Sequence, residues 1–266
     1  MLNEKAYALG ANRSVIRDLF EYGLSRAAIV GPENIYDYSL GNPSIPSPPE
    51  VNETIRQILS DTDSLKIHGY TSAVGDFDTR KAISDDLNAR YKAETKPEEF
   101  FIGCGAAPEL VSVFRALSVP GGEILAIAPY FPEYKPFVEE AGLKFKVVPA
   151  DVPSFQINFE ALDKAITENT QAIILNSPNN PSGVVYTVET LQKLSRLLQD
   201  KIMEHGHTIY LISDEPYREL TYGVEAPWIP SLYSDTIVCY SYSKSLSLPG
   251  ERIGYIYVPT MATQSK

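Results

Sequence analysis

The chain has 266 residues, of which 44% are hydrophobic and 21% charged, a composition typical of globular proteins. This length predicts one large domain or two small ones. The formal net charge of −11 argues against binding nucleic acid or an anionic membrane through bulk charge, although it leaves room for an anion in a local pocket. No apolar run approaches the roughly 18–20 residues that span a bilayer, so no transmembrane helix is predicted.

The N-terminal and cysteine patterns predict a cytoplasmic protein. Residues 1–10 lack a basic region followed by an apolar core, so no signal peptide is expected. Two cysteines, Cys104 and Cys239, do not make a disulfide framework, which fits a reducing compartment. The three histidines and these cysteines show no spacing typical of metal ligands, so no metal site is predicted.

Helical and strand patterns alternate along most of the chain. Helices are predicted at residues 15–24, 51–60, 76–92, 108–117, 134–141, 159–166 and 188–205, and the proline-rich stretch 41–49 predicts an extended strap. Short apolar runs predict seven strands, at 100–102, 124–127, 144–148, 172–175, 209–212, 237–240 and 255–258. The alternation favours a layered α/β fold with a mostly parallel sheet, in which ligands gather at the carboxyl ends of strands.

A turn of small residues follows the first predicted strand. Gly103-Cys104-Gly105-Ala106-Ala107 precedes Pro108, which suits the first turn of a helix. Such a turn exposes backbone N–H groups at the positive end of the helix dipole, where a phosphate binds well. A tight turn without a ligand is the alternative. The dinucleotide-binding fingerprint is broken, because Pro108 stands where its third glycine should be.

Polar and aromatic residues follow three further strands. Phe131, in Pro129-Tyr130-Phe131, either stacks on a planar ligand or caps the core. Asn180 lies in a rigid turn cluster, where it either donates to a ligand oxygen or forms local Asx bonds. Asp214 follows a buried strand, where an acid is costly unless it has a cationic partner. A helix N-cap is the alternative for Asp214, and Tyr217 lies three residues further on.

Lys244 follows the sixth predicted strand directly, with Arg252 eight residues later. A lysine that is partly desolvated near a second cation has a lowered pKa, which makes its amine a nucleophile for Schiff-base formation. A solvated surface lysine is the alternative. One ligand satisfies all five strand ends, namely pyridoxal phosphate, a planar phosphorylated aldehyde with a ring nitrogen and a phenolic oxygen.

Taken together, the motifs resemble those of class I and II aminotransferases of the aspartate aminotransferase type, which are pyridoxal phosphate enzymes of fold type I. The resemblance runs in family order over about residues 12–258. The matching stretches are Gly41-Asn42-Pro43, His68-Gly69-Tyr70 with Gly75 and Arg80, Gly105-Ala106-Ala107, Pro129-Tyr130-Phe131-Pro132-Glu133-Tyr134, Ser177-Pro178-Asn179-Asn180-Pro181-Ser182-Gly183, Ser213-Asp214-Glu215-Pro216-Tyr217 and Ser241-Tyr242-Ser243-Lys244 with Arg252.

The resemblance implies a three-layer α/β sandwich with a mostly parallel seven-stranded sheet as the large domain. It divides the chain into an N-terminal arm and the start of a small domain (1–46), the large cofactor-binding domain (47–258) and a tail (259–266). The family continues for well over a hundred residues, including an arginine that binds the substrate carboxylate, and no arginine follows Arg252 here. We therefore expect a fragment with an incomplete small domain, inactive when alone.

The resemblance also implies roles at the matching positions. Lys244 would bind the cofactor and move the substrate proton, and Asp214 would pair with the ring nitrogen. The remaining cofactor contacts would be Asn180 and Tyr217 at the phenolic oxygen, Phe131 on the ring face, and Gly105, Ala106, Ala107, Ser241, Ser243 and Arg252 at the phosphate. Lys244, Asp214 and Tyr217 would be the catalytic residues. Tyr70 would reach the neighbouring site of a homodimer, and Gly41 and Asn180 would bind substrate.

The activity implied is that of an aminotransferase acting on an L-amino acid and a 2-oxo acid. A β-elimination (carbon–sulfur) lyase of the same fold is the alternative, because the same lysine and acid serve both reactions. A dinucleotide-binding domain is disfavoured by the broken glycine fingerprint. An inactive relative is disfavoured by the presence of Lys244, Asp214, Asn180, Tyr217 and Arg252.

Overall fold

The computed structural model describes residues 4–11 and 15–260 of the chain. By its contacts the chain divides into two compact units, Met1–Pro46 and Ser47–Lys266. The N-terminal unit holds the helices α1 (Glu4–Ala11) and α2 (Val15–Val30) and the short 3-10 helix η1 (Pro32–Asn34). The predicted strap is extended up to Pro48, where Pro49 begins the next helix. The assignment of three segments to a small domain, a large domain and a tail stays a prediction, and residues 261–266 lie outside the described part.

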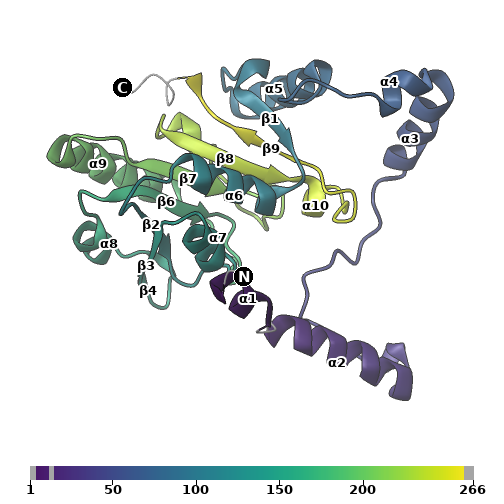
Figure 1. Cartoon of the computed structure of the whole chain (residues 1–266), viewed down its shortest axis with the longest axis horizontal. Coiled ribbons are helices and arrows are strands. Elements are labelled where there is room, and N and C mark those ends of the chain that lie inside the picture. Colours follow the sequence, from purple (N-terminus) through teal and green to yellow (C-terminus); the bar gives the residue numbers. More distant parts are fainter. Residues whose placement is uncertain (1–3, 12–14, 261–266) are drawn as a thin grey trace. The chain divides into compact units, whose positions relative to one another are not determined.

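The second unit is built on a seven-stranded sheet with the order β1-β9-β8-β7-β6-β2-β3 (Figure 1). The strands are β1 (Phe100–Gly103), β2 (Glu123–Ile127), β3 (Lys144–Val148), β6 (Thr170–Asn176), β7 (Tyr210–Asp214), β8 (Thr236–Ser241) and β9 (Gly254–Tyr257). β9 is antiparallel to both of its neighbours, and the other adjacent strands are parallel. The predicted α/β fold with a mostly parallel seven-stranded sheet is therefore confirmed.

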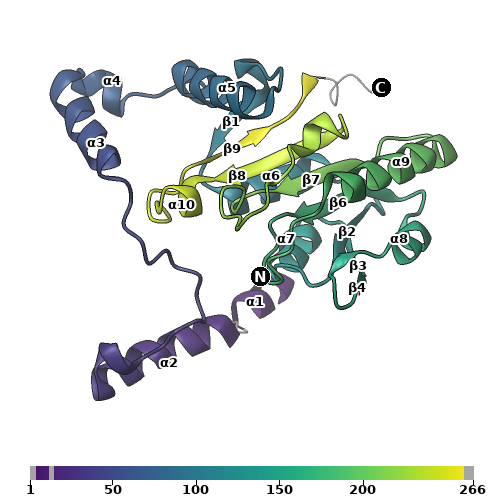
Figure 2. The ribbon, with the colours of Figure 1, turned by 180° about the vertical axis from the view of Figure 1, so that it is seen from behind.

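Helices cover both faces of this sheet, because side chains along each buried strand alternate between two apolar cores. On β6, Ile173 and Leu175 join the core under α9, whereas Ala172 and Ile174 join the core under α6 and α7. Figure 2 shows the α8 and α9 side of the sheet. The second unit's helices are α3 (Pro49–Asp61), α4 (Ser64–His68), α5 (Phe77–Tyr91), α6 (Ala106–Ala116), α7 (Tyr134–Glu140), α8 (Phe159–Ala165), α9 (Val188–His205) and α10 (Tyr242–Ser245), with 3-10 turns η2 (Pro97–Glu99) and η3 (Ile229–Ser231).

Local capping explains why the helix limits were readable from the sequence. The Thr187 side chain accepts a hydrogen bond from the Thr190 amide at the start of α9, and Gly206 ends that helix with a φ of 76°. α6 begins two residues before its predicted start, because Gly105, with a φ of 95°, already serves as its N-cap. The two-stranded hairpin of β4 (Ala150–Asp151) and β5 (Gln156–Ile157) was not predicted.

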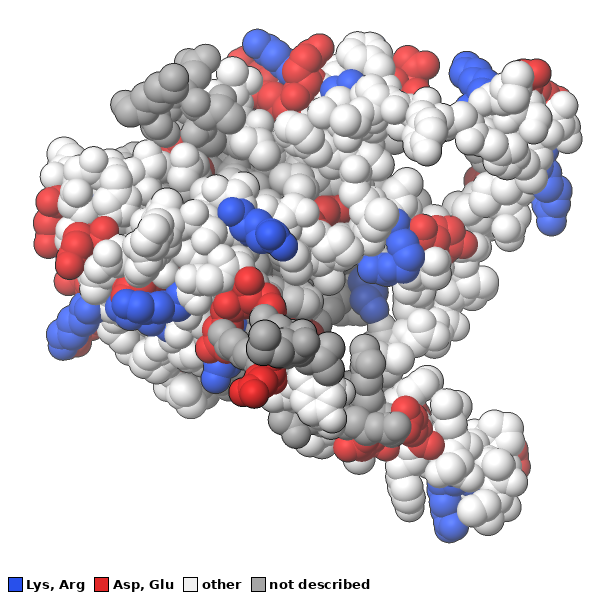
Figure 3. Space-filling model, in the orientation of Figure 1, with Lys and Arg blue, Asp and Glu red and all other residues white. Residues whose placement is uncertain are grey.

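The surface of the described residues agrees with the acidic composition. On the face drawn in Figure 3, acidic and basic side chains are interspersed without a broad basic area. None of the helices in the described ranges is long and apolar enough to cross a membrane. Those same ranges contain no group of His, Cys, Asp and Glu side chains arranged to hold a metal ion.

The close approach of β9 to β8 leaves no room for a side chain at Gly254. A Cβ added there would lie 2.2 Å from the carbonyl oxygen of Tyr240, whereas one added at Gly250 would meet nothing within 4 Å. We expect Gly254→Ala to lower the free energy of unfolding by about 3 kcal/mol, because backbone has to move. Gly250→Ala should change it by less than about 0.5 kcal/mol. Equal denaturant midpoints for the two variants would contradict this account of the strand pair.

Candidate active site

A cavity of about 210 Å³ opens where the carboxyl ends of β6, β7 and β8 meet α6 and α10. The parallel register places these ends together, because Asn176 pairs with Asp214 and Asp214 pairs with Cys239. Most of the residues predicted from the motifs line this one cavity. They are Ala106, Ala107, Phe131, Asn180, Asp214, Tyr217, Ser241, Ser243, Lys244 and Arg252.

Asp214 is a buried acid with one oxygen unused. It is the last residue of β7 and is 5% exposed. The Tyr134 hydroxyl donates a hydrogen bond to Oδ2, whereas Oδ1 has no partner among the described residues. Burial raises the pKa of Asp214 to about 7. Asp214 is therefore a strand residue and not a helix N-cap. Its carboxylate lines the cavity and would be stabilised by a cationic N–H donor.

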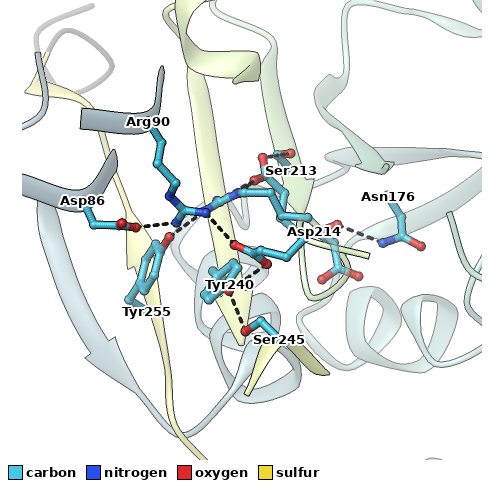
Figure 4. Close-up of polar contacts among 11 residues, drawn as sticks. Asp86, Arg90, Asn176, Ser213, Asp214, Tyr240, Ser245 and Tyr255 are labelled. Carbon is cyan, nitrogen blue, oxygen red and sulfur yellow. Dashed lines mark hydrogen bonds and ion pairs between the residues drawn. The ribbon is translucent and has the colours of Figure 1, made fainter. Parts of the chain in front are cut away.

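The buried cation close to Asp214 in the sequence, Arg218, pairs with Glu215 rather than with Asp214. Arg218 forms an ion pair of 2.5 Å with Glu215, and both side chains are buried. Ser213 donates a 2.5 Å hydrogen bond to Glu215, and Arg218 donates one of 2.8 Å to the Tyr255 hydroxyl. Figure 4 labels Ser213 and Tyr255 of this group, together with Asp214 and with Asn176, whose side chain donates to the Asp214 carbonyl oxygen at 2.8 Å. These contacts hold the segment after β7 in place.

Asn180 and Tyr217 lie together at a second side of the cavity. The backbone amide of Asn180 donates to Asn176 Oδ1 at 2.6 Å, which ties the turn to the end of β6. Burial raises the pKa of Tyr217, and the charge of Asp214 raises it further, whereas a hydrogen bond with the Asn180 side chain lowers it. The pair offers an amide and a phenol to one ligand atom.

Of the two adjacent aromatics, only Phe131 is among the cavity-lining residues. Its ring packs edge-on against Tyr134 with a centroid distance of 5.6 Å. Tyr130 instead packs against Phe145 at 5.1 Å. Phe131 thus presents an apolar ring to the cavity.

The small-residue turn, two serines and an arginine form what we call the anion cradle, defined as Gly105, Ala106, Ala107, Ser241, Ser243 and Arg252. The N-terminus of α6 points its amides into this region. The hydroxyls of Ser241 and Ser243 lie 2.7 Å apart. Arg252 donates to the carbonyl oxygen of Pro249 at 2.9 Å, and a Cβ on Gly105 would come within 2.9 Å of Arg252 Nη2. Amides, hydroxyls and a guanidinium suit an anion such as phosphate.

Lys244 lies on the short helix α10, directly after β8. Burial lowers its pKa, so the amine is more readily neutral than that of a surface lysine. The sequence predicts Arg252 as a second cause of a lowered pKa, whereas burial is the cause that accounts for the lowering in the structure. The neighbouring Ser245 Oγ lies 2.8 Å from the Tyr240 hydroxyl, which in turn donates to Glu219 at 2.9 Å (Figure 4).

Two predicted residues of the second unit, Tyr70 and Gly105, are not among the residues that line the cavity. Tyr70 follows α4 and its side chain is fully exposed. Gly41 belongs to the N-terminal unit. Their roles stay predictions.

Sequence reasoning missed two residues that the fold places near the cavity. Tyr134 was visible only as the end of an aromatic motif, and its contact with Asp214 joins residues 80 positions apart. Glu109, on the first turns of α6, is 2% exposed, and its only sequence signal is an acid inside an apolar helix face.

The fold and cavity define an α/β protein with a ligand site at the carboxyl ends of parallel strands, equipped with a lysine, a buried acid and an anion cradle. The sequence matches the family "Aminotransferase class I and II" over residues 33–265, and the chain belongs to that family. A probable aspartate/prephenate aminotransferase of Aquifex aeolicus is 32% identical over 236 residues, covering 85% of this chain and 56% of the relative.

Solved structures agree with this assignment. A crystal structure of an amino transferase from Eubacterium rectale superposes with a TM-score of 0.95 at 54% identity, covering 98% of this chain and 66% of that one. The aspartate aminotransferase of Thermus thermophilus, solved with maleate, has a TM-score of 0.85 at 27% identity, covering 100% of this chain and 66% of that one. The present chain spans a little over half the length of the curated relatives it matches.

The buried acid predicts a pH-dependent stability. Because burial raises the pKa of Asp214 from 3.8 to about 7, the folded state holds the Asp214 proton more tightly than the unfolded state does. The stability that this proton adds is complete at low pH and is lost as pH rises from 3.8 to about 7. We expect Asp214→Asn to be more stable than the wild type at pH 8, by about 2–4 kcal/mol at roughly 1.4 kcal/mol per pKa unit.

Thermal unfolding at several pH values checks this, with exposed Asp200→Asn on α9 as the matched control. The advantage of Asp214→Asn should shrink as pH falls toward 4, and Asp200→Asn should stay close to the wild type throughout. A variant less stable than the wild type at pH 8 would contradict the assignment of Asp214 as a destabilised acid.

Proposed function

We propose that this chain is the pyridoxal phosphate-binding part of an aminotransferase that moves an amino group between an L-amino acid and a 2-oxo acid. Membership of the aminotransferase family supports this reaction class. The observation that carries the proposal is the convergence of Lys244, Asp214 and the anion cradle on one cavity. No single motif assembles these groups, because they come from separate strand ends.

The cavity residues fit pyridoxal phosphate. The unpartnered Oδ1 of Asp214 suits a protonated ring nitrogen. Asn180 and Tyr217, already hydrogen bonded to each other, suit the phenolic oxygen, and Phe131 suits the ring face. The anion cradle suits the phosphate through α6 amides, two hydroxyls and Arg252. Because Ala106 and Ala107 lack hydroxyls, this part of the cradle contributes backbone N–H groups.

When bound, pyridoxal phosphate supplies an aldehyde for amines and a ring that withdraws electrons from the substrate Cα. Asp214 holds a proton on the ring nitrogen, because the buried carboxylate needs a cationic donor. The Lys244 amine, which is more readily neutral because burial lowers its pKa, would take the proton from Cα and return it. Tyr217 and Asn180 orient the ring through its phenolic oxygen. The Glu215–Arg218 ion pair keeps Asp214 and Tyr217 in register with the cavity.

The same proposal includes a cytoplasmic homodimer, whose Tyr70 reaches the neighbouring subunit's phosphate and whose Gly41 lines the substrate carboxylate site. Full exposure of the Tyr70 side chain within this chain supports a contact made elsewhere. Relatives of similar identity carry different substrate names, aspartate/prephenate in one and N-acetyl-LL-diaminopimelate in another. The proposal therefore extends to amino acid and 2-oxo acid substrates as a class.

Reductive labelling tests the cofactor and its lysine without requiring turnover. Incubation of the 266-residue chain with pyridoxal phosphate, followed by borohydride and peptide mass spectrometry, should place one phosphopyridoxyl group on Lys244. Lys244→Ala should lose at least about tenfold of the label, because Lys244 is the lysine that lines the cavity beside the cradle in the described part of the chain. Lys135→Ala, at an exposed position on α7, should label like the wild type.

Label scattered over surface lysines in a folded chain would contradict the cofactor assignment. If Lys244 is labelled, product analysis on the full-length protein separates the two reactions. A 2-oxo acid with the amine retained on the cofactor supports transamination, whereas pyruvate with ammonia would identify the β-elimination lyase instead.

A further inference from the structure

Behind the anion cradle lies a buried acid that the proposed mechanism does not use. Glu109 is 2% exposed, and neither of its carboxylate oxygens has a hydrogen-bond partner of normal geometry among the described residues. Asp214 lies near enough for the two charges to repel each other. Ionising a buried carboxyl that lacks a partner costs free energy, so burial favours the neutral form of Glu109.

Two glycines make room for the Glu109 carboxyl. A Cβ on Gly103 would lie 2.7 Å from Glu109 Oε1, and one on Gly254 would lie 2.5 Å from the same atom. Gly103 and Gly254 are paired residues of β1 and β9, and Gly254 also pairs with Ser241 at the end of β8. The carboxyl therefore lies against the sheet where β1 and β8 end and β9 begins, on the inner side of the cradle.

The cradle lies directly on the other side of Gly105. A Cβ on Gly254 would come within 3.0 Å of the Gly105 Cα, and one on Gly105 would come within 2.9 Å of Arg252 Nη2 and 3.6 Å of Ser241 Oγ. Only a glycine backbone thus separates the Glu109 carboxyl from the arginine and serine that face the cavity. A negative charge on Glu109 would act on any anion held there.

We propose that Glu109 is a positioning residue of the anion cradle, which supports phosphate binding in its neutral form and weakens it when it ionises. This inference rests on the proposed function, because it concerns the phosphate of the same cofactor. When the phosphate dianion binds to protein in which Glu109 is ionised, the Glu109 carboxylate takes up one proton from solvent. Cradle binding and proton uptake are therefore coupled.

The groups around Glu109 fix the direction of this coupling. Burial is the main cause that raises the pKa of Glu109 to about 8, and the charge of Asp214 on β7 is the next. The backbone amides of Gly105 and Tyr240 oppose these two causes by favouring the charged form, and Arg252 adds a smaller effect in the same direction. On β8, burial keeps the Cys239 thiol neutral by raising its pKa, and on α7 the Tyr134 hydroxyl reaches Asp214 rather than Glu109. Glu109 is thus neutral at pH 7 and ionised well above pH 8.

Ligand affinity measured at two pH values tests the proposal. The probes are pyridoxine 5′-phosphate, whose alcohol cannot join covalently to Lys244, and pyridoxine, which lacks the phosphate. Between pH 7 and pH 9 the wild type should lose about tenfold more affinity for the phosphorylated probe than for pyridoxine, as expected when only the neutral form of a carboxyl with a pKa of about 8 supports phosphate binding. A phosphate monoester, with a second pKa of about 6, stays a dianion over this range.

Glu109→Gln should abolish this extra loss, because an amide of the same shape cannot ionise, and it should bind within about threefold of the wild type at pH 7. Glu140→Gln, at an exposed position at the end of α7, is the matched control and should behave like the wild type. The same extra loss in Glu109→Gln as in the wild type would overturn the role of Glu109 while leaving the proposed function standing. Failure of the wild type to bind pyridoxine 5′-phosphate at pH 7 would overturn both.

Calorimetry of the wild type gives an independent readout that does not need the variant to fold. Titrations at pH 8 in two buffers with different ionisation enthalpies measure the protons taken up on binding. Binding of pyridoxine 5′-phosphate should be accompanied by the uptake of roughly half a proton more than binding of pyridoxine, because Glu109 is about half ionised at pH 8 before the ligand binds. Equal proton uptake for the two probes would overturn the proposal.

Discussion

The parallel register of β6, β7 and β8 is the constraint on which the cavity depends. It brings Asn176, Asp214 and Cys239 side by side at one edge of the sheet. Because all three strands are buried on both faces, a slip of one residue would exchange the two apolar cores and move Asp214 to the wrong face. The packing that stabilises the fold therefore also fixes the acid against Tyr134, and the turns that follow each strand inherit their positions from it.

Opposite side-chain directions at the end of β7 explain why Asp214, its last residue, and Glu215, the residue after it, behave differently. Asp214 points to the core face that carries Tyr134, whereas Glu215 meets Arg218 beside Tyr240 and Tyr255, which belong to a different core cluster. Arg218 lies over the Trp228 and Tyr240 rings at 5.1 and 4.6 Å, so its charge is held by aromatic faces as well as by Glu215. One acid is neutralised within the protein, and the other remains available to a ligand.

The sequence predicted what local pattern determines. Apolar runs located all seven strands of the sheet, and helical patterns located helices such as α9, predicted at 188–205. It also predicted that the motif residues would follow strands, and in the structure Asp214 and Ser241 are the last strand residues because pairing continues through them. Strand order, the antiparallel direction of β9 and the Tyr134–Asp214 contact depend on pairing between distant segments, which no local pattern encodes.

Glu109 illustrates the remaining gap between pattern and site. In the sequence it is one acid among apolar residues of a helix, and a helical-periodicity argument would place it at the edge of the buried face. Its burial depends on Gly103 and Gly254, which lie on two strands paired across the sheet. Two buried acids, Asp214 and Glu109, then share the neighbourhood of the single cradle arginine, Arg252. Since that guanidinium cannot neutralise both acids and a phosphate, at least one acid has to be neutral when the anion binds. In the proposed function Asp214 gains a cationic donor from the ligand, and this proposal leaves Glu109 as the neutral acid.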